Sequence, residues 1–222
     1  MSQETETFEI ILGRVEHINA SHFNCLSFAK ASDMANGINV RLSNMAGGYP
    51  FSFGGVTWRD SETLYLCGEF SDSSEKHLLV QEDMQRQTSG FAAKRFIKKR
   101  NSNLIRQDFA DFRIQWMLYV IWQKCKGNAD FANLLLKLPH DAIIIEISKA
   151  ALKRIVNSET CKVNGIGTFV GQNNLGKILM ICRDCLIQGV EPPIDYALLN
   201  RSNIYILGRR LSFPTDKTSM SN

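Results

Sequence analysis

The chain has 222 residues, of which 44% are hydrophobic and 22% charged, and a formal net charge of +4. This length and composition allow a sizeable core and indicate one globular domain, because two domains would be cramped. No apolar run approaches the roughly eighteen residues that a membrane span needs, and Met1 to Glu6 lacks the basic and apolar regions of a signal peptide. We therefore expect a soluble, cytoplasmic protein without a membrane partner.

The first sixty residues predict short strands and a long loop. Phe8 to Leu12 and Cys25 to Phe28 are strand candidates. Between Ala31 and Gly55 the chain is rich in Gly, Ser, Asn and aromatic residues, which predicts a loop region with a hairpin near Phe51 to Trp58.

Asp60 is a good N-cap for a helix that carries two glutamates. Glu62 lies in the first turn and Glu69 follows seven residues later, so the two carboxylates share one helix face. The helix dipole favours the ionised form of a first-turn glutamate. The alternative interpretation of Glu62 is a surface charge that only complements the dipole.

The remaining segments alternate between helices and short strands. The apolar residues of the longest predicted helix fall on one broad face and belong to the core. Glu146 is the single acid in a run of isoleucines and needs a partner there. In chain order we predict a partly helical segment from Asp72 to Ser89, a long helix from Asn103 to Lys126, a helix from Asn128 to Leu138, a buried strand from Ala142 to Ile147, a short helix from Lys149 to Val156, and an edge strand from Asn203 to Leu207 before a disordered tail.

A glycine-rich stretch from Gly165 to Gly176 leads directly into an apolar run at helical spacing. We expect a flexible loop at a helix N-terminus, where unpaired backbone N–H groups and the helix dipole suit an anion. Gly171 to Lys177 has the spacing of a phosphate-binding loop, but Ile178 replaces the hydroxyl residue that holds magnesium. A dinucleotide fingerprint fits less well, and a simple turn with a helix start remains the alternative.

The segment from Lys94 to Arg106 carries six basic residues and no acidic one, with Phe96 among them. Such a run attracts phosphate backbones, and interleaved aromatic rings can stack on unpaired bases. The candidate nucleic-acid residues are Lys94, Arg95, Lys98, Lys99 and Arg100. A solvated surface is the alternative interpretation.

The six cysteines lie in apolar or helical segments, which indicates reduced thiols rather than a secreted disulfide framework. Cys182 and Cys185 form a CxxC motif, but the chain has no second pair, and none of its four histidines has ligand spacing to this one. We predict buried helical cysteines, no metal and no cofactor.

The order of these features resembles the NADAR or YbiA-like family. The resemblance spans about Leu42 to Leu186, and its last block is the most specific. The motifs that carry it are Leu42-Ser43-Asn44, Phe53-Gly54, Ser61-Glu62, Trp116 with Lys124-Cys125, Leu134-Leu135, Ile145-Glu146-Ile147-Ser148, Asn164-Gly165-Ile166-Gly167, and Gly171-Gln172-Asn173-Asn174-Leu175-Gly176 with Leu179-Met180 and Arg183.

The resemblance implies a mostly α fold with a few short β-strands (α+β), in a single YbiA-like domain at 41–189, with an N-terminal extension at 1–40 and a C-terminal extension and tail at 190–222. It also implies hydrolysis of an N-glycosidic bond in an ADP-ribosyl or phosphoribosyl compound. Some family members reverse ADP-ribosylation of guanine bases as partners of toxin transferases. The implied partners are therefore ADP-ribose or a related nucleotide, ADP-ribosylated DNA or RNA, and a toxin.

The sequence departs from the family pattern at three places. Asn164 stands where the family has tryptophan, the acid that usually precedes it is absent from Cys161 to Val163, and Leu66 and Glu69 replace a Gln and a Lys on the first helix. Loss of the tryptophan removes a stacking surface for a base. These departures keep a catalytically impaired nucleotide-binding protein as one alternative, and a nucleic-acid-binding module built on the basic run as another.

Cleavage of a ribosyl N-glycosidic bond builds positive, oxocarbenium-like charge on the sugar. An ionised carboxylate stabilises this charge or activates the water that attacks the sugar. Glu62 is the candidate for this role, and Glu146 or Glu69 for protonating the leaving base. We expect Asn44 and Asn173 to hold ribose hydroxyls or phosphate oxygens, and the backbone of the glycine-rich stretch to receive a diphosphate. The full set of predicted ligand-binding residues is Asn44, Asn164, Gly165, Gly167, Gly171, Asn173, Asn174 and Arg183.

Overall fold

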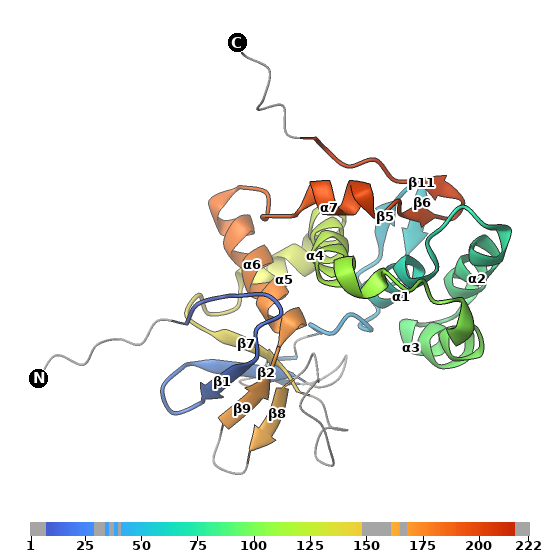
Figure 1. The fold of residues 1–222 in the computed structure, drawn as a ribbon. Coiled ribbons are helices and arrows are strands. Elements are labelled where there is room, and N and C mark those ends of the chain that lie inside the picture. The colour runs from blue at the N-terminus through green and yellow to red at the C-terminus, as the bar shows by residue number, and fades with distance from the viewer. Residues whose placement is uncertain are drawn as a thin grey trace, which may run out of the picture. The chain divides into compact units, whose positions relative to one another are not determined.

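A computed structural model describes residues 8–28, 34–35, 38–39, 41–147, 161–164 and 168–215 of the chain, with only the backbone at 34–35, 38–39 and 161–164. Helices dominate and the strands are short, which confirms the predicted mostly α (α+β) class (Figure 1). Backbone contacts divide the chain into two compact units, residues 1–46 with 128–192 and residues 47–127 with 193–222. We describe each unit by itself.

The described part of the first unit combines small sheets with the helices α5 and α6 (Figure 1). Its antiparallel sheet has the strand order β1-β9-β8, and β2 pairs in parallel with β7. Its elements are β1 (Glu16–Asn19), β2 (Cys25–Phe28), β3 (Met34–Ala35), β4 (Ile38–Asn39), α5 (Ala129–Leu136), β7 (Ile143–Glu146), β8 (Cys161–Asn164), β9 (Thr168–Gly171) and α6 (Asn174–Gln188).

The core of the first unit lies where α6 packs on β7. Three successive isoleucines of β7, Ile143 to Ile145, are buried, as expected for a strand covered on both faces. Gly176 allows the close contact, because a Cβ at this position would lie 2.1 Å from the carbonyl oxygen of Ile144. The helix ends at Gly189, whose left-handed backbone is a common C-terminal signal.

Lys177, in the first turn of α6, is a structural residue. It has no exposed surface, and its ammonium donates to the carbonyl oxygens of Ile11 (2.7 Å) and Arg14 (2.8 Å) and to Glu16 Oε1 (2.8 Å). Burial by itself raises the pKa of Glu16, but the hydrogen bonds from Lys177 and Arg14 outweigh it and bring that pKa below its ordinary value. Lys177 is therefore not available to bind a phosphate, which argues against the phosphate-binding-loop interpretation.

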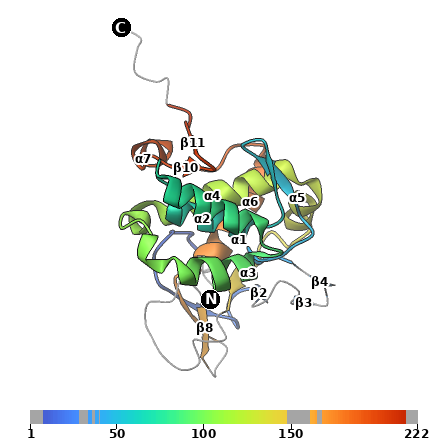
Figure 2. The ribbon, with the colours of Figure 1, turned by 90° about the vertical axis from the view of Figure 1, so that its right-hand side faces the viewer.

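The second unit is mainly helical. Figure 2 shows α1 and α2 side by side with α3 next to α1, and α1 also packs on α4. Its elements are β5 (Phe51–Phe53), β6 (Val56–Trp58), α1 (Ser61–Cys67), the 3-10 turn η1 (Gly68–Phe70), α2 (Glu75–Arg86), α3 (Gly90–Ala92), the π-helix η2 (Ala93–Lys98), the 3-10 turn η3 (Ser102–Leu104), α4 (Phe109–Gly127), α7 (Tyr196–Arg201), β10 (Tyr205–Ile206) and β11 (Arg209–Arg210).

Trp116 of α4 fixes the end of α1. Its indole N–H donates to the carbonyl oxygen of Tyr65 at 3.1 Å. A Cβ at Gly68 would lie 2.3 Å from the same indole nitrogen, so only glycine lets the two helices approach this closely. The predicted apolar face of this long helix is thus confirmed as core.

Several predicted elements are confirmed, among them β2, the β5–β6 hairpin, α2, α5, β7 and β10. Other predictions need correction. Phe8 to Leu12 forms no strand, and the first strand starts at Glu16. The long helix α4 begins at Phe109 rather than at Asn103, and the helix α7 was not expected. The predicted helix from Lys149 to Val156 and the residues from Asp216 onward lie outside the described residues, and the predicted division at 40 and 190 stays a prediction.

Gly176→Ala should destabilise the protein by about 1–3 kcal/mol, because the new Cβ meets the Ile144 carbonyl and the helix must shift. Gly189→Asn is the matched control, since open space surrounds Gly189 and asparagine tolerates its backbone conformation, so less than about 1 kcal/mol is expected. Urea denaturation of both variants makes the comparison, and equal stabilities would contradict the close packing of α6 on β7.

Candidate functional site

Asp60 builds the start of α1 and ties it to α3. Its Oδ1 accepts from the backbone N–H (2.8 Å) and the hydroxyl (2.7 Å) of Thr63, and its Oδ2 accepts from the N–H of Gly90 (2.9 Å). The predicted N-cap is confirmed. A Cβ at Gly90 would lie 2.7 Å from both Asp60 and Glu62, so the glycine allows the first turns of the two helices to meet.

Glu62 and Glu69 are both buried, at 5% and 4% exposure. Each carboxylate pairs with a lysine of η2: Glu62 Oε1 lies 2.9 Å from Lys94 Nζ, and Glu69 Oε1 lies 2.6 Å from Lys98 Nζ. The interpretation of Glu62 as a surface charge is therefore wrong. We call Glu62, Tyr65, Glu69, Lys94 and Lys98 the carboxylate–lysine cluster.

Glu69 is the group in this cluster that is least satisfied. Its Oε2 is buried and has no hydrogen-bond partner among the described residues. Burial raises the pKa of Glu69 above its ordinary value, against the opposing effect of the Lys98 ammonium. Burial also raises the pKa of Tyr65, and the nearby charges of Glu69 and Glu62 raise it further. A carboxyl group with a raised pKa can hold a proton for transfer.

The basic run divides into two groups in the structure. Lys94 and Lys98, four residues apart on η2, pair with the cluster carboxylates, which the sequence did not indicate, and their role in nucleic-acid binding stays a prediction. Arg95 lies over the rings of Phe91 (5.9 Å) and Phe96 (5.6 Å), and both rings are more than half exposed. Lys99 is exposed, and Arg100 pairs with Asp83 at 3.3 Å.

In the first unit, Asn173 holds β7 rather than presenting its side chain to a ligand. It is fully buried with a left-handed backbone, its Oδ1 accepts from the N–H of Glu146 (2.9 Å), and its Nδ2 donates to the carbonyl of Ile144 (2.7 Å). The expectation that this amide binds ribose or phosphate needs correction, because both of its ends are engaged. Glu146 itself is half-buried at the end of the strand.

Other predicted ligand-binding residues of this unit are also engaged in the fold. Asn174 Oδ1 accepts from the N–H of Gly13 at 2.8 Å. Gly171 lies in the central strand β9, opposite both Glu16 and Cys161, and not in the flexible loop that we expected. Asn44 is buried, Asn164 lies in β8 with its side chain outside the description, and Gly165 and Gly167 are not among the described residues.

Arg183 is buried as well. Its Nη1 donates to the carbonyl oxygens of Pro139 (2.7 Å) and Ala142 (3.0 Å), and its Nε donates to Asp184 (3.3 Å).

Two kinds of feature are absent from the residues that the structure describes. They contain no group of three or more His, Cys, Asp or Glu side chains that could hold a metal ion. They also contain no helix with the length and apolar character that a membrane span requires.

The comparison with known proteins bears on the fold of the chain. No family model and no curated protein matches the chain. The NMR structure of the E. coli protein YbiA matches with 27% sequence identity and a TM-score of 0.56, over 75% of this chain and 86% of that chain. The chain has a YbiA-like fold. At 27% identity the chain is a divergent example of this fold.

Within this YbiA-like fold, sequence reasoning found Glu62 and Glu69 but missed their partners. The seven-residue spacing of the glutamates and the four-residue spacing of Lys94 and Lys98 were the available signal, since both place like charges on one face of a helix. Tyr65 was missed because an aromatic residue at helical spacing more often belongs to the core. The cluster as a whole offers an ion-paired carboxylate beside a buried carboxyl of raised pKa.

Glu69 should make unfolding depend on pH with a defined sign. Because its folded pKa lies above the unfolded value of 4.5, the folded state keeps a proton that the unfolded state loses, so its contribution to stability falls as pH rises from 4.5 through the folded pKa. Glu69→Gln should remove this decline in stability. Lys98→Met should make the decline steeper, because the Lys98 ammonium lowers the pKa of Glu69.

Urea denaturation from pH 4 to pH 7 measures the decline in the unmodified protein and both variants. An identical pH profile for the unmodified protein and Glu69→Gln would show that Glu69 has the same pKa folded and unfolded.

Proposed function

We propose that the protein hydrolyses the N-glycosidic bond of an ADP-ribosyl or phosphoribosyl compound, and that it removes ADP-ribose from guanine bases in nucleic acid. The observation that carries this proposal is the buried carboxylate–lysine cluster on α1, η1 and η2 of a YbiA-like fold. On this proposal, a toxin transferase that attaches ADP-ribose is the partner whose modification the protein reverses.

The two glutamates take different roles in the proposed reaction. Glu62, held by Lys94, is the ionised carboxylate that stabilises the oxocarbenium-like carbon or activates the attacking water. Glu69 donates a proton to the leaving base, because its raised pKa and unpaired oxygen suit an acid. Water supplies the hydroxyl that completes the sugar, and its remaining proton returns to a carboxylate. Glu146 of the first unit is a separate candidate, which its own variant tests.

Glu62→Gln should lower kcat by about two to four decades, because it keeps the size of the side chain and removes its charge. Ligand Kd and Tm should change little, since Lys94 is half exposed and remains solvated. The assay incubates the protein with NAD, ADP-ribose and ADP-ribosylated guanine DNA and reads the released base by mass spectrometry. Glu75→Gln, at the exposed start of α2, is the matched control.

Three outcomes separate the alternatives. A lower Tm with unchanged kcat would make Glu62 a structural residue. Ligand binding without any turnover in the unmodified protein would instead indicate a catalytically impaired nucleotide-binding protein, as the departures at Leu66, Glu69 and Asn164 allow. Turnover that survives in Glu62→Gln but disappears in Glu146→Gln would move the chemistry to the end of β7.

A nucleic-acid-binding role is the second candidate, favoured by Phe91 and Phe96 on either side of Arg95. Exposed rings that are not part of the core offer stacking surfaces to unpaired bases, and the neighbouring guanidinium adds positive charge. Lys99 extends the positive surface. This role is compatible with the first proposal, because the modified guanine would belong to the bound strand.

Replacing Arg95 and Lys99 by Gln should make single-stranded DNA binding less dependent on salt. The slope of log K against log salt concentration should become shallower by about 0.7 for each phosphate contact that is lost. Phe96→Ala should weaken binding by about 1–3 kcal/mol without changing that slope. Fluorescence anisotropy at several salt concentrations measures both effects. Arg86→Gln on α2 is the matched basic control, and equal losses for it and for the Arg95 and Lys99 change would indicate general charge attraction only.

A further inference from the structure

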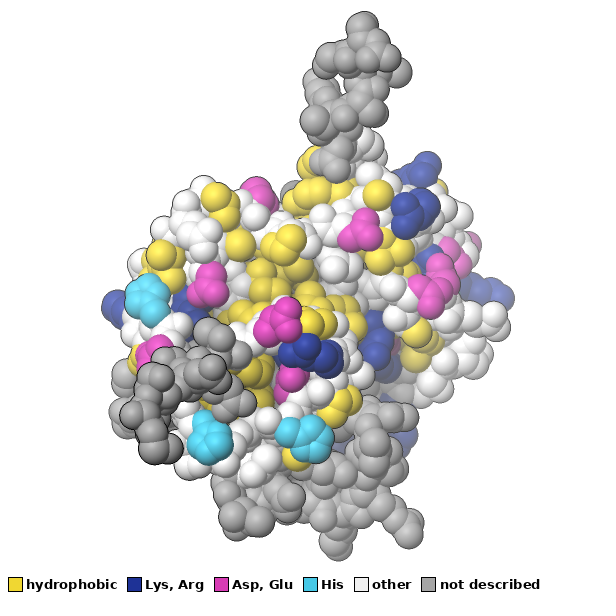
Figure 3. Space-filling view, turned by 60° about the vertical axis from the view of Figure 1, so that its left-hand side comes forward, with side chains coloured by type: hydrophobic (Ala, Val, Ile, Leu, Met, Phe, Trp, Pro, Cys, Tyr) yellow, Lys and Arg dark blue, Asp and Glu magenta, His cyan; other side chains and the backbone are white. Residues whose placement is uncertain are grey.

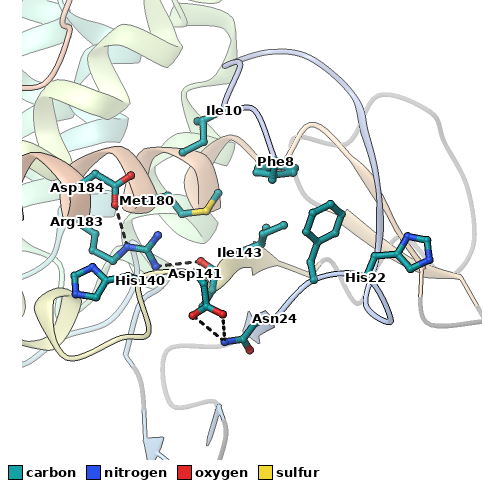
Figure 4. A pocket seen from close by; sticks show the side chains of 12 residues that line it. Phe8, Ile10, His22, Asn24, His140, Asp141, Ile143, Met180, Arg183 and Asp184 are labelled. Carbon is teal, nitrogen blue, oxygen red and sulfur yellow. Dashed lines mark hydrogen bonds and ion pairs between the residues drawn. The ribbon is translucent and has the colours of Figure 1, made fainter. Parts of the chain in front are cut away.

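A cavity of about 390 Å³ opens in the first unit at the beginning of β7, the opposite end of the strand from Glu146. Its volume is in the range of small-molecule sites. Figure 4 shows Arg183, His140 and Asp141 on one side and Phe8 and His22 on the other, with Met180 and Ile143 between them. Arg183 is the one residue of this cavity lining that the sequence predicted to bind a ligand.

The cavity has an apolar floor with one buried cation. Ala142, Ile143 and Met180 are buried, and Arg183 is 3% exposed. The Nη1 and Nε atoms of Arg183 are engaged, whereas its Nη2 has no acceptor within the described part of the chain. A guanidinium edge with open donors beside an apolar floor suits a carboxylate.

Two carboxylates line the same cavity as this guanidinium. Asp184 accepts from Arg183 Nε at 3.3 Å, and Asp141 precedes Ala142, whose carbonyl oxygen accepts from Arg183 Nη1. The Asp141 oxygens each lie 3.3 Å from the amide nitrogen of Asn24, a long contact that leaves them able to accept more. An anion site and cation acceptors therefore lie side by side, as the two charged groups of a zwitterion require.

The apolar wall has the shape of a corner. Phe8 and Phe23 meet edge to face, with ring centroids 6.1 Å apart and planes at 73°. Two rings at this angle do not make the parallel slot in which a flat purine stacks, but they enclose a branched aliphatic chain or a single ring. Ile10 extends the wall. On the face drawn in Figure 3, hydrophobic side chains lie exposed beside acidic, basic and histidine side chains.

We propose that this cavity binds a free α-amino acid with a large apolar side chain, of the phenylalanine or leucine class. Arg183 Nη2 receives the carboxylate, Asp141 and Asp184 accept from the ammonium, and the corner of Phe8 and Phe23 holds the side chain. A phosphorylated ligand fits less well, because the lining has two carboxylates and one arginine and no lysine. This inference does not depend on the glycosidase proposal.

The test is titration of the full chain with L-phenylalanine and L-leucine, followed by the backbone amide shifts of Ala142 and Ile143. A ligand of this size should bind with a Kd on the order of 1 mM. N-acetyl-L-phenylalanine and L-phenylalaninamide each lack one of the two charges, and each should bind at least about tenfold more weakly. These two probes also separate a free amino acid from either end of a peptide.

Asp141→Asn should weaken binding by about tenfold, because it removes the charge that faces the ammonium while Asn24 can still donate to its oxygen. Asp130→Asn on α5, exposed and outside the cavity, is the matched control and should bind normally. Arg183 is left unchanged, since its loss would free two buried carbonyl groups and threaten folding.

Saturable binding with these losses supports the proposal. No shift at about twenty times the expected Kd would overturn it. Equal affinity for phenylpropionate, which has no ammonium, would reduce the cavity to a simple anion site and also overturn it. If adenosine shifted the same amides and L-phenylalanine did not, the cavity would be assigned to a nucleoside instead.

Discussion

Charged groups that leave water must meet partners, and this constraint decides which residues of the chain stay available for chemistry. In the first unit Lys177 is surrounded by two carbonyl oxygens and Glu16, so its charge is fully used in joining α6 to the N-terminal segment. In the second unit Glu62 and Glu69 are almost as deeply buried, yet one oxygen of Glu69 has no partner among the described residues. A buried carboxyl oxygen without a hydrogen-bond partner costs stability, and such costs are concentrated at functional sites.

Several glycines of the described chain serve close packing. Gly68, Gly90 and Gly176 each lie where a Cβ would come within 2.1–2.7 Å of another element. Glycines near a helix start have two physical explanations, an anion that approaches the backbone or a neighbouring element that does so, and both leave the same pattern in the sequence. At Gly176 the approaching group is the carbonyl of Ile144, about thirty residues away in the chain.

The features that were predictable from sequence depend on local physics. The Asp60 cap, the isoleucine strand β7 and the end of α6 at Gly189 each follow from a few neighbouring residues. Pairings between distant segments were not predictable. The strands β1 and β9 lie some 150 residues apart in sequence, and a strand whose partner is unknown shows only a weak pattern. The same holds for the candidate site, where the glutamates and the lysines could each be identified but their pairing across α1, η1 and η2 could not.

Glu69 stands where the family pattern that the sequence resembles has a lysine. A lysine at residue 69 would bring a second ammonium toward Lys98 Nζ, which now lies 2.6 Å from the Glu69 carboxylate. Two cations at such a distance in a buried place repel strongly, so the residues at 69 and 98 depend on each other. In this chain Lys94 and Lys98 supply the positive charge of the cluster, and Glu69 adds a carboxyl that can hold a proton. The departure at residue 69 leaves both lysines in place, so it does not by itself argue against catalysis.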